Sequence, residues 1–209
     1  MEQELRERIV LWGRSLFERG FTVGSSGNLS VRCGEGFLVT PTNSCLGMLG
    51  ADSLSLLDSS WAHVSGAKPT KELPLHRAFY EARSQTQAVV HLHSTYATIL
   101  SCLSGVDPHD AIPSITPYVV MRVGKVPVLP YTTPGSGEVV ALVAPVAHEH
   151  TAVLLANHGP VVAGLSLDAA VFAAEELEET AKLVVLTRGL DVRHLSAEQI
   201  AGLQKFNLR

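Results

Sequence analysis

Short strand-like runs alternate with amphipathic segments along the whole chain, and this alternation constrains the fold more than any other feature. Apolar runs at 88–93 and 152–156 have the length of buried strands and end in polar residues. The runs at 29–32 and 36–40 flank a glycine-containing turn and predict a β-hairpin. No repeat or linker divides the chain, so residues 1–209 fit one domain. We predict a single α/β domain with a mixed, mostly antiparallel central β-sheet flanked by α-helices.

Apolar spacing and helix-stop signals place the helices. Gly20 ends the first helix, Gly189 ends a long later one, and Ser196 with Gln199 forms a capping box for the last. Pro145 must kink its helix or lie near the helix start. The predicted helices cover 1–20, 71–83, 96–103, 139–150 and 168–188, followed by the short helix after Ser196, and a further short strand is predicted at 125–129.

Charge and cysteine content exclude several functional classes. The chain has 16 basic and 20 acidic residues, so no basic excess indicates nucleic-acid binding. The N-terminal segment lacks the apolar core of a signal peptide, and no apolar run reaches membrane-spanning length. The three cysteines are far apart and predict free thiols, buried or partly buried. We expect a cytoplasmic protein that binds neither nucleic acid nor membrane.

Three histidines have the positions of metal ligands. His91 and His93 lie two residues apart on a predicted strand, which directs both rings to the same face. His158 follows another predicted strand, at a strand-to-loop corner. Three imidazoles with one open position are typical of a catalytic zinc site. The alternative is three partly buried histidines bonded to backbone carbonyls. His148 and His150 share the spacing but lie in a predicted helix end, which points them apart, so we reject that pair.

Glu72 begins a predicted helix, where a carboxylate is favoured by the helix dipole alone. It could instead face the metal, act as proton donor or acceptor, and fill the vacant ligand position. His76, one turn later, could support Glu72 by hydrogen bonding or be an ordinary helix residue.

Three small polar segments could bind an anion through backbone N–H groups at turns and helix starts. They are Ser25 to Asn28, Thr42 to Ser44, and Thr70-Lys71, whose ammonium group adds charge-assisted bonds. None has the P-loop pattern, which argues against nucleotide hydrolysis.

Five motifs in order resemble those of the class II aldolase/adducin-head family, across nearly the whole chain. They are GNLS (27–30), TPTN (40–43), KPTKE (68–72), HLH (91–93) and NHG (157–159). The resemblance implies one zinc ion per subunit, or another divalent metal, held by His91, His93 and His158, with Glu72 as acid/base and resting-state ligand. It also implies phosphate contacts from five residues: Asn28, Thr42, Asn43, Thr70 and Lys71.

The same resemblance implies a homotetramer with its sites near subunit interfaces, so that a neighbouring subunit can contribute a residue. Tyr118 is the candidate for this second catalytic role, and a buried tyrosine beside Pro117 is the alternative.

Within the family, the segments at 40–47, 63–81, 116–124 and 154–164 are most similar to the branch that decarboxylates 3-oxo-tetronate 4-phosphate. Asn43 and Thr70-Lys71 replace residues of the aldolase motifs, which separates this chain from fuculose-type recognition. The branch implies loss of CO₂ through a metal-stabilised enediolate, giving dihydroxyacetone phosphate. An aldolase or 4-epimerase acting on a phosphorylated sugar is the first alternative. A non-catalytic adducin-like interaction module is the second.

Overall fold

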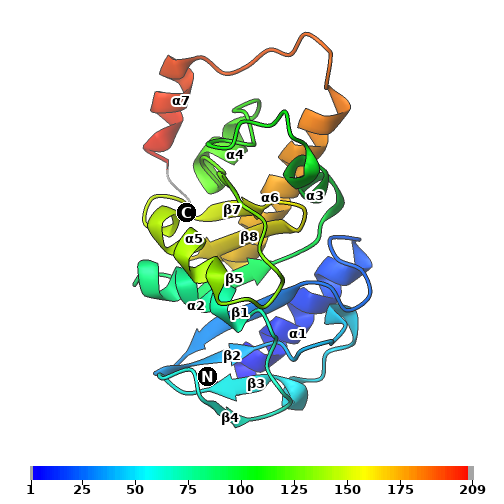
Figure 1. Ribbon diagram of the computed structural model, residues 1–209, viewed down its shortest axis with the longest axis vertical. Helices are drawn as coiled ribbons and strands as arrows, with labels where there is room; N and C mark the ends of the chain where they lie inside the picture. The colour runs from blue at the N-terminus through cyan, green and yellow to red at the C-terminus, as the bar shows by residue number, and fades with distance from the viewer. Residues whose placement is uncertain (1, 207–209) are drawn as a thin grey trace.

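The computed structural model describes residues 2–206 and has one eight-stranded sheet in the order β4-β3-β2-β1-β5-β8-β7-β6. Every neighbouring pair is antiparallel except β6 and β7, which are parallel. The predicted single domain with a mixed, mostly antiparallel sheet is therefore confirmed (Figure 1). The strands are β1 (Asn28–Cys33), β2 (Gly36–Val39), β3 (Ser55–Leu57), β4 (His63–Ser65), β5 (Ala88–His91), β6 (Val128–Leu129), β7 (Ala152–Leu155) and β8 (Gly159–Gly164).

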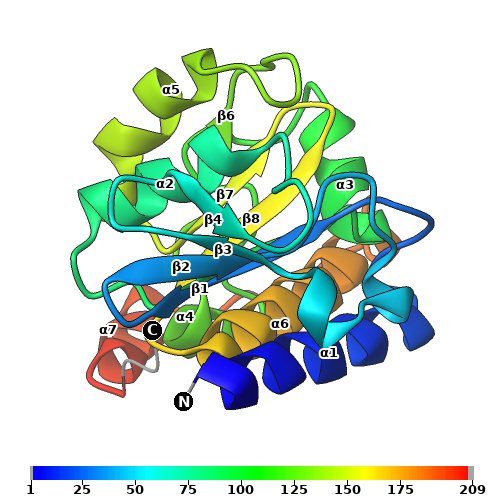
Figure 2. The same cartoon turned by 90° about the horizontal axis from the view of Figure 1, so that it is seen from below.

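Helices cover both faces of this sheet and bury two apolar layers (Figure 2). Helices α1 and α6 pack on one face, where Ile9, Leu16 and Leu177 are fully buried. Helices α2 and α5 pack on the other, around Phe79 and Val143. The helices are α1 (Glu2–Glu18), α2 (Leu73–Ala82), α3 (Thr95–Cys102), α4 (Pro117–Arg122), α5 (Glu138–Ala147), α6 (Leu167–Leu186) and α7 (Ala197–Gln204), with 3₁₀ turns η1 (Leu46–Met48) and η2 (Ala51–Ser53). None of the described helices combines the length and apolar character that crossing a membrane requires.

Several predicted boundaries were wrong for local reasons. The strand predicted at 125–129 is only β6, because Val126 bonds to the 110–111 segment and Pro127 has no N–H to donate. Pro145 lies in the last turn of α5, not near its start. The short strands β3 and β4, the strand β8 and the helix α4 were not predicted. The three cysteines are free thiols, as predicted, although Cys102 is exposed.

The candidate histidine ligands lie at or just beyond the ends of the central strands β5, β7 and β8. β5 pairs with β8, so that His91 lies opposite Val161, and β7 returns into β8 through residues 156–158. Asn157 occupies the left-handed region in this turn (φ 57°), a conformation that asparagine tolerates better than most residues. The turn places His158 beside the end of β5.

Candidate metal centre

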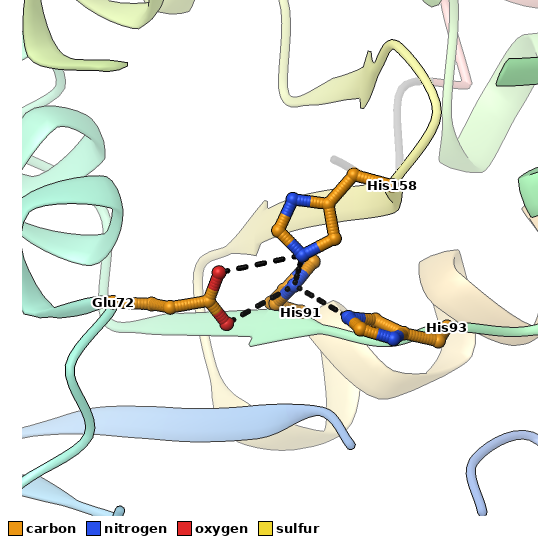
Figure 3. Close-up of side chains that lie close together, drawn as sticks. All are labelled: Glu72, His91, His93 and His158. Carbon is orange, nitrogen blue, oxygen red and sulfur yellow. Dashed lines mark hydrogen bonds and ion pairs between the residues drawn. The ribbon is translucent and has the colours of Figure 1, made fainter. Parts of the chain in front are cut away.

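Four side chains converge at the ends of the central strands (Figure 3). The Nε2 atom of His91 lies 3.2 Å from Nε2 of His93 and 3.2 Å from Nε2 of His158. The two carboxylate oxygens of Glu72 lie 3.3 Å from His91 Nε2 and 3.4 Å from His158 Nε2. All four ligand atoms lie within 4.8 Å of one another.

These distances match those between ligand atoms that surround a single metal ion. Ligands about 2.0–2.1 Å from a tetrahedral zinc ion are separated by roughly 3.3 Å, close to the four separations in this cluster. A proton on one ring could satisfy only one of the two contacts that His91 Nε2 makes with other imidazole nitrogens. Neutral imidazoles with a carboxylate are a donor set suited to a divalent transition metal. The residues present therefore fit a bound cation.

Neighbouring backbone groups orient the ligands. The Nδ1–H of His91 donates to the carbonyl of Pro160 at 2.9 Å, which leaves the Nε2 lone pair directed at the cluster. Beyond His93, the carboxylate of Glu178 on α6 accepts hydrogen bonds from the backbone N–H groups of Tyr96 and Ala97, both at 2.8 Å. Glu178 thereby caps α3 in place of a local side chain. The segment that carries His93 is thus fixed at both ends.

The protonation states also favour metal binding. Burial, together with the charge of neighbouring His91, lowers the pKa of His93 and of His158 to about 4. Both rings are neutral at pH 7 and keep a free lone pair. Burial tends to raise the pKa of Glu72, but the hydrogen bond and charge of His91 and the Asn28 amide outweigh it and lower that pKa. Glu72 is therefore a carboxylate.

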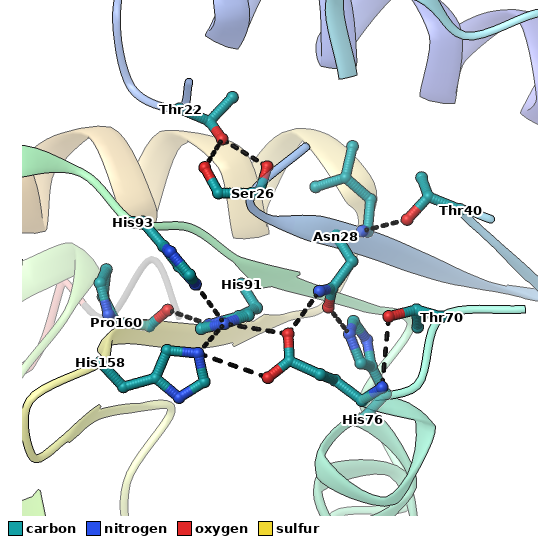
Figure 4. A network of polar contacts seen from close by, with 12 residues as sticks. Thr22, Ser26, Asn28, Thr40, Thr70, His76, His91, His93, His158 and Pro160 are labelled. Carbon is teal, nitrogen blue, oxygen red and sulfur yellow. Dashed lines mark hydrogen bonds and ion pairs between the residues drawn. The ribbon is translucent and has the colours of Figure 1, made fainter. Parts of the chain in front are cut away.

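Asn28 and His76 face each other (Figure 4), and Asn28 also contacts Glu72. The Asn28 amide donates to Glu72 Oε2 at 2.8 Å, and its carbonyl oxygen lies 2.5 Å from Nε2 of His76. The suggested support of Glu72 by His76 is thus indirect, through Asn28. Burial is the main cause that lowers the pKa of His76 to about 3, so this fully buried ring is neutral.

A cavity of about 400 Å³ opens beside this cluster, with Glu72, His93 and His158 among its lining residues. The predicted anion-binding residues, Asn28, Thr42, Asn43, Thr70 and Lys71, all line it. Two of the segments are joined, because Thr42 N–H donates to Lys68 O at 2.9 Å and Thr70 N–H donates to Thr40 O at 3.1 Å. Among the described lining residues, Lys71 has the only Lys or Arg side chain. The cavity therefore combines a cluster that could hold a metal with one cationic side chain and several small polar residues.

Backbone conformation and a local hydrogen bond explain particular residues in two of the loops that line the cavity. Asn43 has a φ of 55°, the left-handed conformation in which asparagine can stand in for glycine. In the segment from Ser25 to Asn28, Thr22 Oγ1 donates to the Ser26 carbonyl at 2.6 Å (Figure 4). This bond closes the turn whose residues Ser25, Ser26 and Gly27 line the cavity.

Tyr118 lies outside the cavity of its own chain. Tyr118 lies on α4 with 53 % of its surface exposed, and it is not among the residues that line the cavity. The alternative of a buried tyrosine is wrong. Tyr131 lines the cavity instead, in a loop that packs Gly135 against Lys71. Sequence reasoning missed Tyr131; the turn-rich run from Thr132 to Gly135 after a strand end was the available signal.

The other histidines take no part in a comparable cluster. In the described residues 2–206, only one group of three or more His, Cys, Asp or Glu side chains could hold a metal. It consists of Glu72, His91, His93 and His158. The rejected pair fits this result: His148 ends α5 and is exposed, and Nδ1 of His150 lies 3.1 Å from the Lys125 carbonyl.

Known proteins resemble the chain over nearly its whole length. The family model described as Class II Aldolase and Adducin N-terminal domain matches residues 7–185. A 3-oxo-tetronate 4-phosphate decarboxylase from Pectobacterium atrosepticum is 51% identical, covering 97% of this chain and 93% of the relative. An L-fuculose phosphate aldolase from Haemophilus influenzae is 34% identical, covering 94% and 90%. The crystal structure of YgbL from Klebsiella pneumoniae matches with a TM-score of 0.94 and 49% identity, covering 97% and 99%.

Proposed function

Because the chain belongs to the class II aldolase and adducin N-terminal domain family, we propose that it is a carbon–carbon lyase that decarboxylates 3-oxo-tetronate 4-phosphate. The products are dihydroxyacetone phosphate and CO₂. The observation that carries this proposal is the His91, His93, His158 and Glu72 cluster beside a cavity lined by Lys71. The 51% identity to a 3-oxo-tetronate 4-phosphate decarboxylase supports this substrate over other phosphorylated sugars.

In this proposal His91, His93 and His158 hold a divalent metal, which we infer to be zinc, and Glu72 completes the ligand set at rest. Such an ion supplies Lewis-acid stabilisation of the negative charge that develops on oxygen as a neighbouring C–C bond breaks.

Glu72 moves the proton. The carboxylate lost as CO₂ is β to the ketone, so its bonding electrons pass toward the ketone oxygen when the C–C bond breaks. Glu72 is a carboxylate at neutral pH and can take the proton of the hydroxyl group on the adjacent carbon. It then returns a proton to that carbon after CO₂ leaves, and solvent restores the hydroxyl group. One proton is consumed per CO₂ released.

The remaining cavity residues bind the substrate. Asn28, Thr42, Asn43, Thr70 and Lys71 contact or surround the phosphate, and Lys71 supplies the cationic charge. Lys71 does not hold the departing carboxylate, because a tightly bound cation would oppose loss of CO₂. Tyr118 is proposed to reach the site of a neighbouring subunit in a homotetramer, in keeping with its exposure and its absence from the cavity lining. We propose that the enzyme acts in the cytoplasm.

An aldolase or 4-epimerase acting on a phosphorylated sugar is the second candidate, favoured by the 34% identity to an L-fuculose phosphate aldolase. The same metal ligands and the same base could support an aldolase or epimerase reaction, since these reactions, like the decarboxylation, break a C–C bond near a ketone. A non-catalytic module gives no reason for three imidazoles and a carboxylate to converge.

A substrate panel tests the proposal. The zinc-loaded protein is incubated separately with 3-oxo-tetronate 4-phosphate of either configuration, L-fuculose 1-phosphate and L-ribulose 5-phosphate. Release of CO₂ and dihydroxyacetone phosphate in equal amounts from a tetronate is the expected result. An aldehyde product from a sugar phosphate, with no CO₂ from either tetronate, would contradict it.

A further inference from the structure

A line of buried polar groups extends away from Glu72 into the core between β1 and α2. The phenol oxygen of Tyr80 lies 3.1 Å from Ser30 Oγ, which lies 2.6 Å from Nδ1 of His76. The line continues from His76 Nε2 to the Asn28 carbonyl oxygen and from the Asn28 amide nitrogen to Glu72. All five residues are at most 6% exposed. Water therefore has little access to these groups and cannot readily compete for their hydrogen bonds.

The chemistry of the groups fixes the direction of every bond. An ionised carboxylate only accepts, so the Asn28 NH₂ group must face Glu72 and its carbonyl oxygen must face His76. That oxygen needs a donor, which requires the His76 tautomer with its proton on Nε2. Nδ1 of His76 then accepts from the Ser30 hydroxyl, whose oxygen accepts from Tyr80. A flipped Asn28 amide would place two acceptors against each other at Glu72 and two donors against each other at His76.

We propose that His76 is a positioning residue that holds the Glu72 carboxylate in place by locking the orientation of the Asn28 amide. The effect of His76 on catalysis rests on the proposed function of Glu72. The hydrogen bonds that fix the Asn28 amide do not depend on that function. The imidazole never reaches the cavity, since its surface is fully buried and it is not among the lining residues. Its influence on the substrate therefore passes through Asn28 and Glu72.

Two His76 variants separate the hydrogen bond from the packing. His76→Phe keeps a ring but removes the donor, so kcat should fall about 10–100-fold, the usual effect of losing a group that orients a ligand. Bound metal should stay at the wild-type level because the three imidazoles remain, and kcat should fall by a larger factor than KM rises. His76→Gln can present an N–H group near the position of Nε2 and should restore kcat to within a few-fold of wild type.

A control variant excludes general destabilisation. Arg6 is another buried polar residue, with hydrogen bonds to Glu2 and to the carbonyls of Ala51 and Leu54, and it is not among the residues that line the cavity. Arg6→Met should lower the unfolding temperature and leave kcat unchanged. A folded His76→Phe protein with wild-type kcat would overturn the proposal. Equal losses in the Gln and Phe variants would also overturn it, because packing would then explain both.

A measurement without substrate keeps the test valid if His76→Phe does not fold or if the proposed substrate is wrong. The nitrogen NMR spectrum of the wild-type protein distinguishes the two neutral tautomers of an imidazole. We expect His76 to carry its proton on Nε2, with Asn28 NH₂ resonances that shift in His76→Gln. A proton on Nδ1 would overturn the proposed lock whatever the enzyme acts on. Inactivity on the substrate panel with the expected tautomer would contradict the proposed function alone.

Discussion

At the residue scale, the local environment decides which side chains can act as ligands and which as a base. His93 and His158 are neutral because burial lowers their pKa values, while Glu72 stays ionised because His91 and the Asn28 amide offset its burial. Similar positions on the surface would leave these histidines partly protonated near pH 6.5. The cluster is thus prepared for a cation before one binds.

Replacing Glu72 by glutamine should separate metal binding from turnover. The three imidazoles remain, so bound metal should stay near one per chain, while kcat should fall about 10²–10⁴-fold because the proton carrier is lost. Steady-state kinetics and elemental analysis check the two quantities. Glu81→Gln is a matched control on the same helix, since Glu81 is half exposed and forms an ion pair with Arg77 away from the cluster. Near wild-type kcat in Glu72→Gln would remove Glu72 from the mechanism.

The buried His76 ring should make stability depend on pH. Its pKa is about 3 when folded and about 6.5 when unfolded, so the unfolded chain binds more protons between these values. The stability is fully present above about pH 6.5 and falls as the pH decreases. From pH 7.5 to 5.5, His76 alone should remove about 1.4 kcal/mol from the unfolding free energy of the metal-free protein. Urea titrations at both pH values measure this loss, which should be smaller in His76→Gln. Equal losses in the two proteins would exclude His76 as its source.

At the scale of elements, the pairing of β5 with β8 brings the ligands together, and Gly159 allows the close approach. Its φ is 152°, and an added Cβ would lie 2.5 Å from the Leu92 carbonyl oxygen. Gly159→Ala should therefore push the His158 turn away from His93, lowering both metal affinity and the unfolding temperature. Gly189→Ala is the matched control, because its φ is also positive (83°) but no atom lies within 4 Å of the added Cβ.

The control should cost about 1 kcal/mol of stability through its backbone alone and leave metal affinity unchanged. Metal titration and thermal unfolding of both variants compare the effects. Unchanged metal affinity in Gly159→Ala would show that the turn can adjust, contrary to the tight packing that the structure displays.

Strong local patterns predicted most of the larger elements, whereas the strand β8 and the shortest elements were missed. The apolar runs of β5 and β7 and the capping box of α7 are complete signals within a few residues. β3 and β4 have three residues each, and β4 is wholly exposed, so neither shows an alternating pattern. α4 had a usable signal that was overlooked, namely Thr116 as cap followed by Pro117.

The candidate site was predictable only where its residues share a local sequence pattern. His91 and His93 share one strand end, but nothing in their spacing reveals that Asn28 bonds to His76, which lies 48 residues away. That contact depends on how α2 packs against β1, which is a property of the tertiary structure. Tyr131 has no motif of its own, and the turn-rich run after it indicates a loop without showing that the loop lines the cavity.

At the scale of the whole molecule, the proposed homotetramer gives Tyr118 its function. Light scattering should give four times the mass of one chain. Tyr118→Phe should lose activity without losing metal or changing the assembly, because its side chain is exposed on α4 and is not among the residues lining the cavity of its own chain. Mixing Tyr118→Phe with Glu72→Gln subunits should restore part of the activity, since some sites would then receive both intact residues. Hybrids that stay inactive would contradict a contribution across the interface.

The central claim is that His91, His93 and His158 bind one divalent cation between them. Anomalous X-ray diffraction at the zinc absorption edge, on crystals of the zinc-loaded protein, tests it directly. The account predicts one peak per chain at this cluster, about 2.0–2.1 Å from the Nε2 atom of each of the three histidines. No peak there, or a zinc ion bound only at other residues, would contradict it.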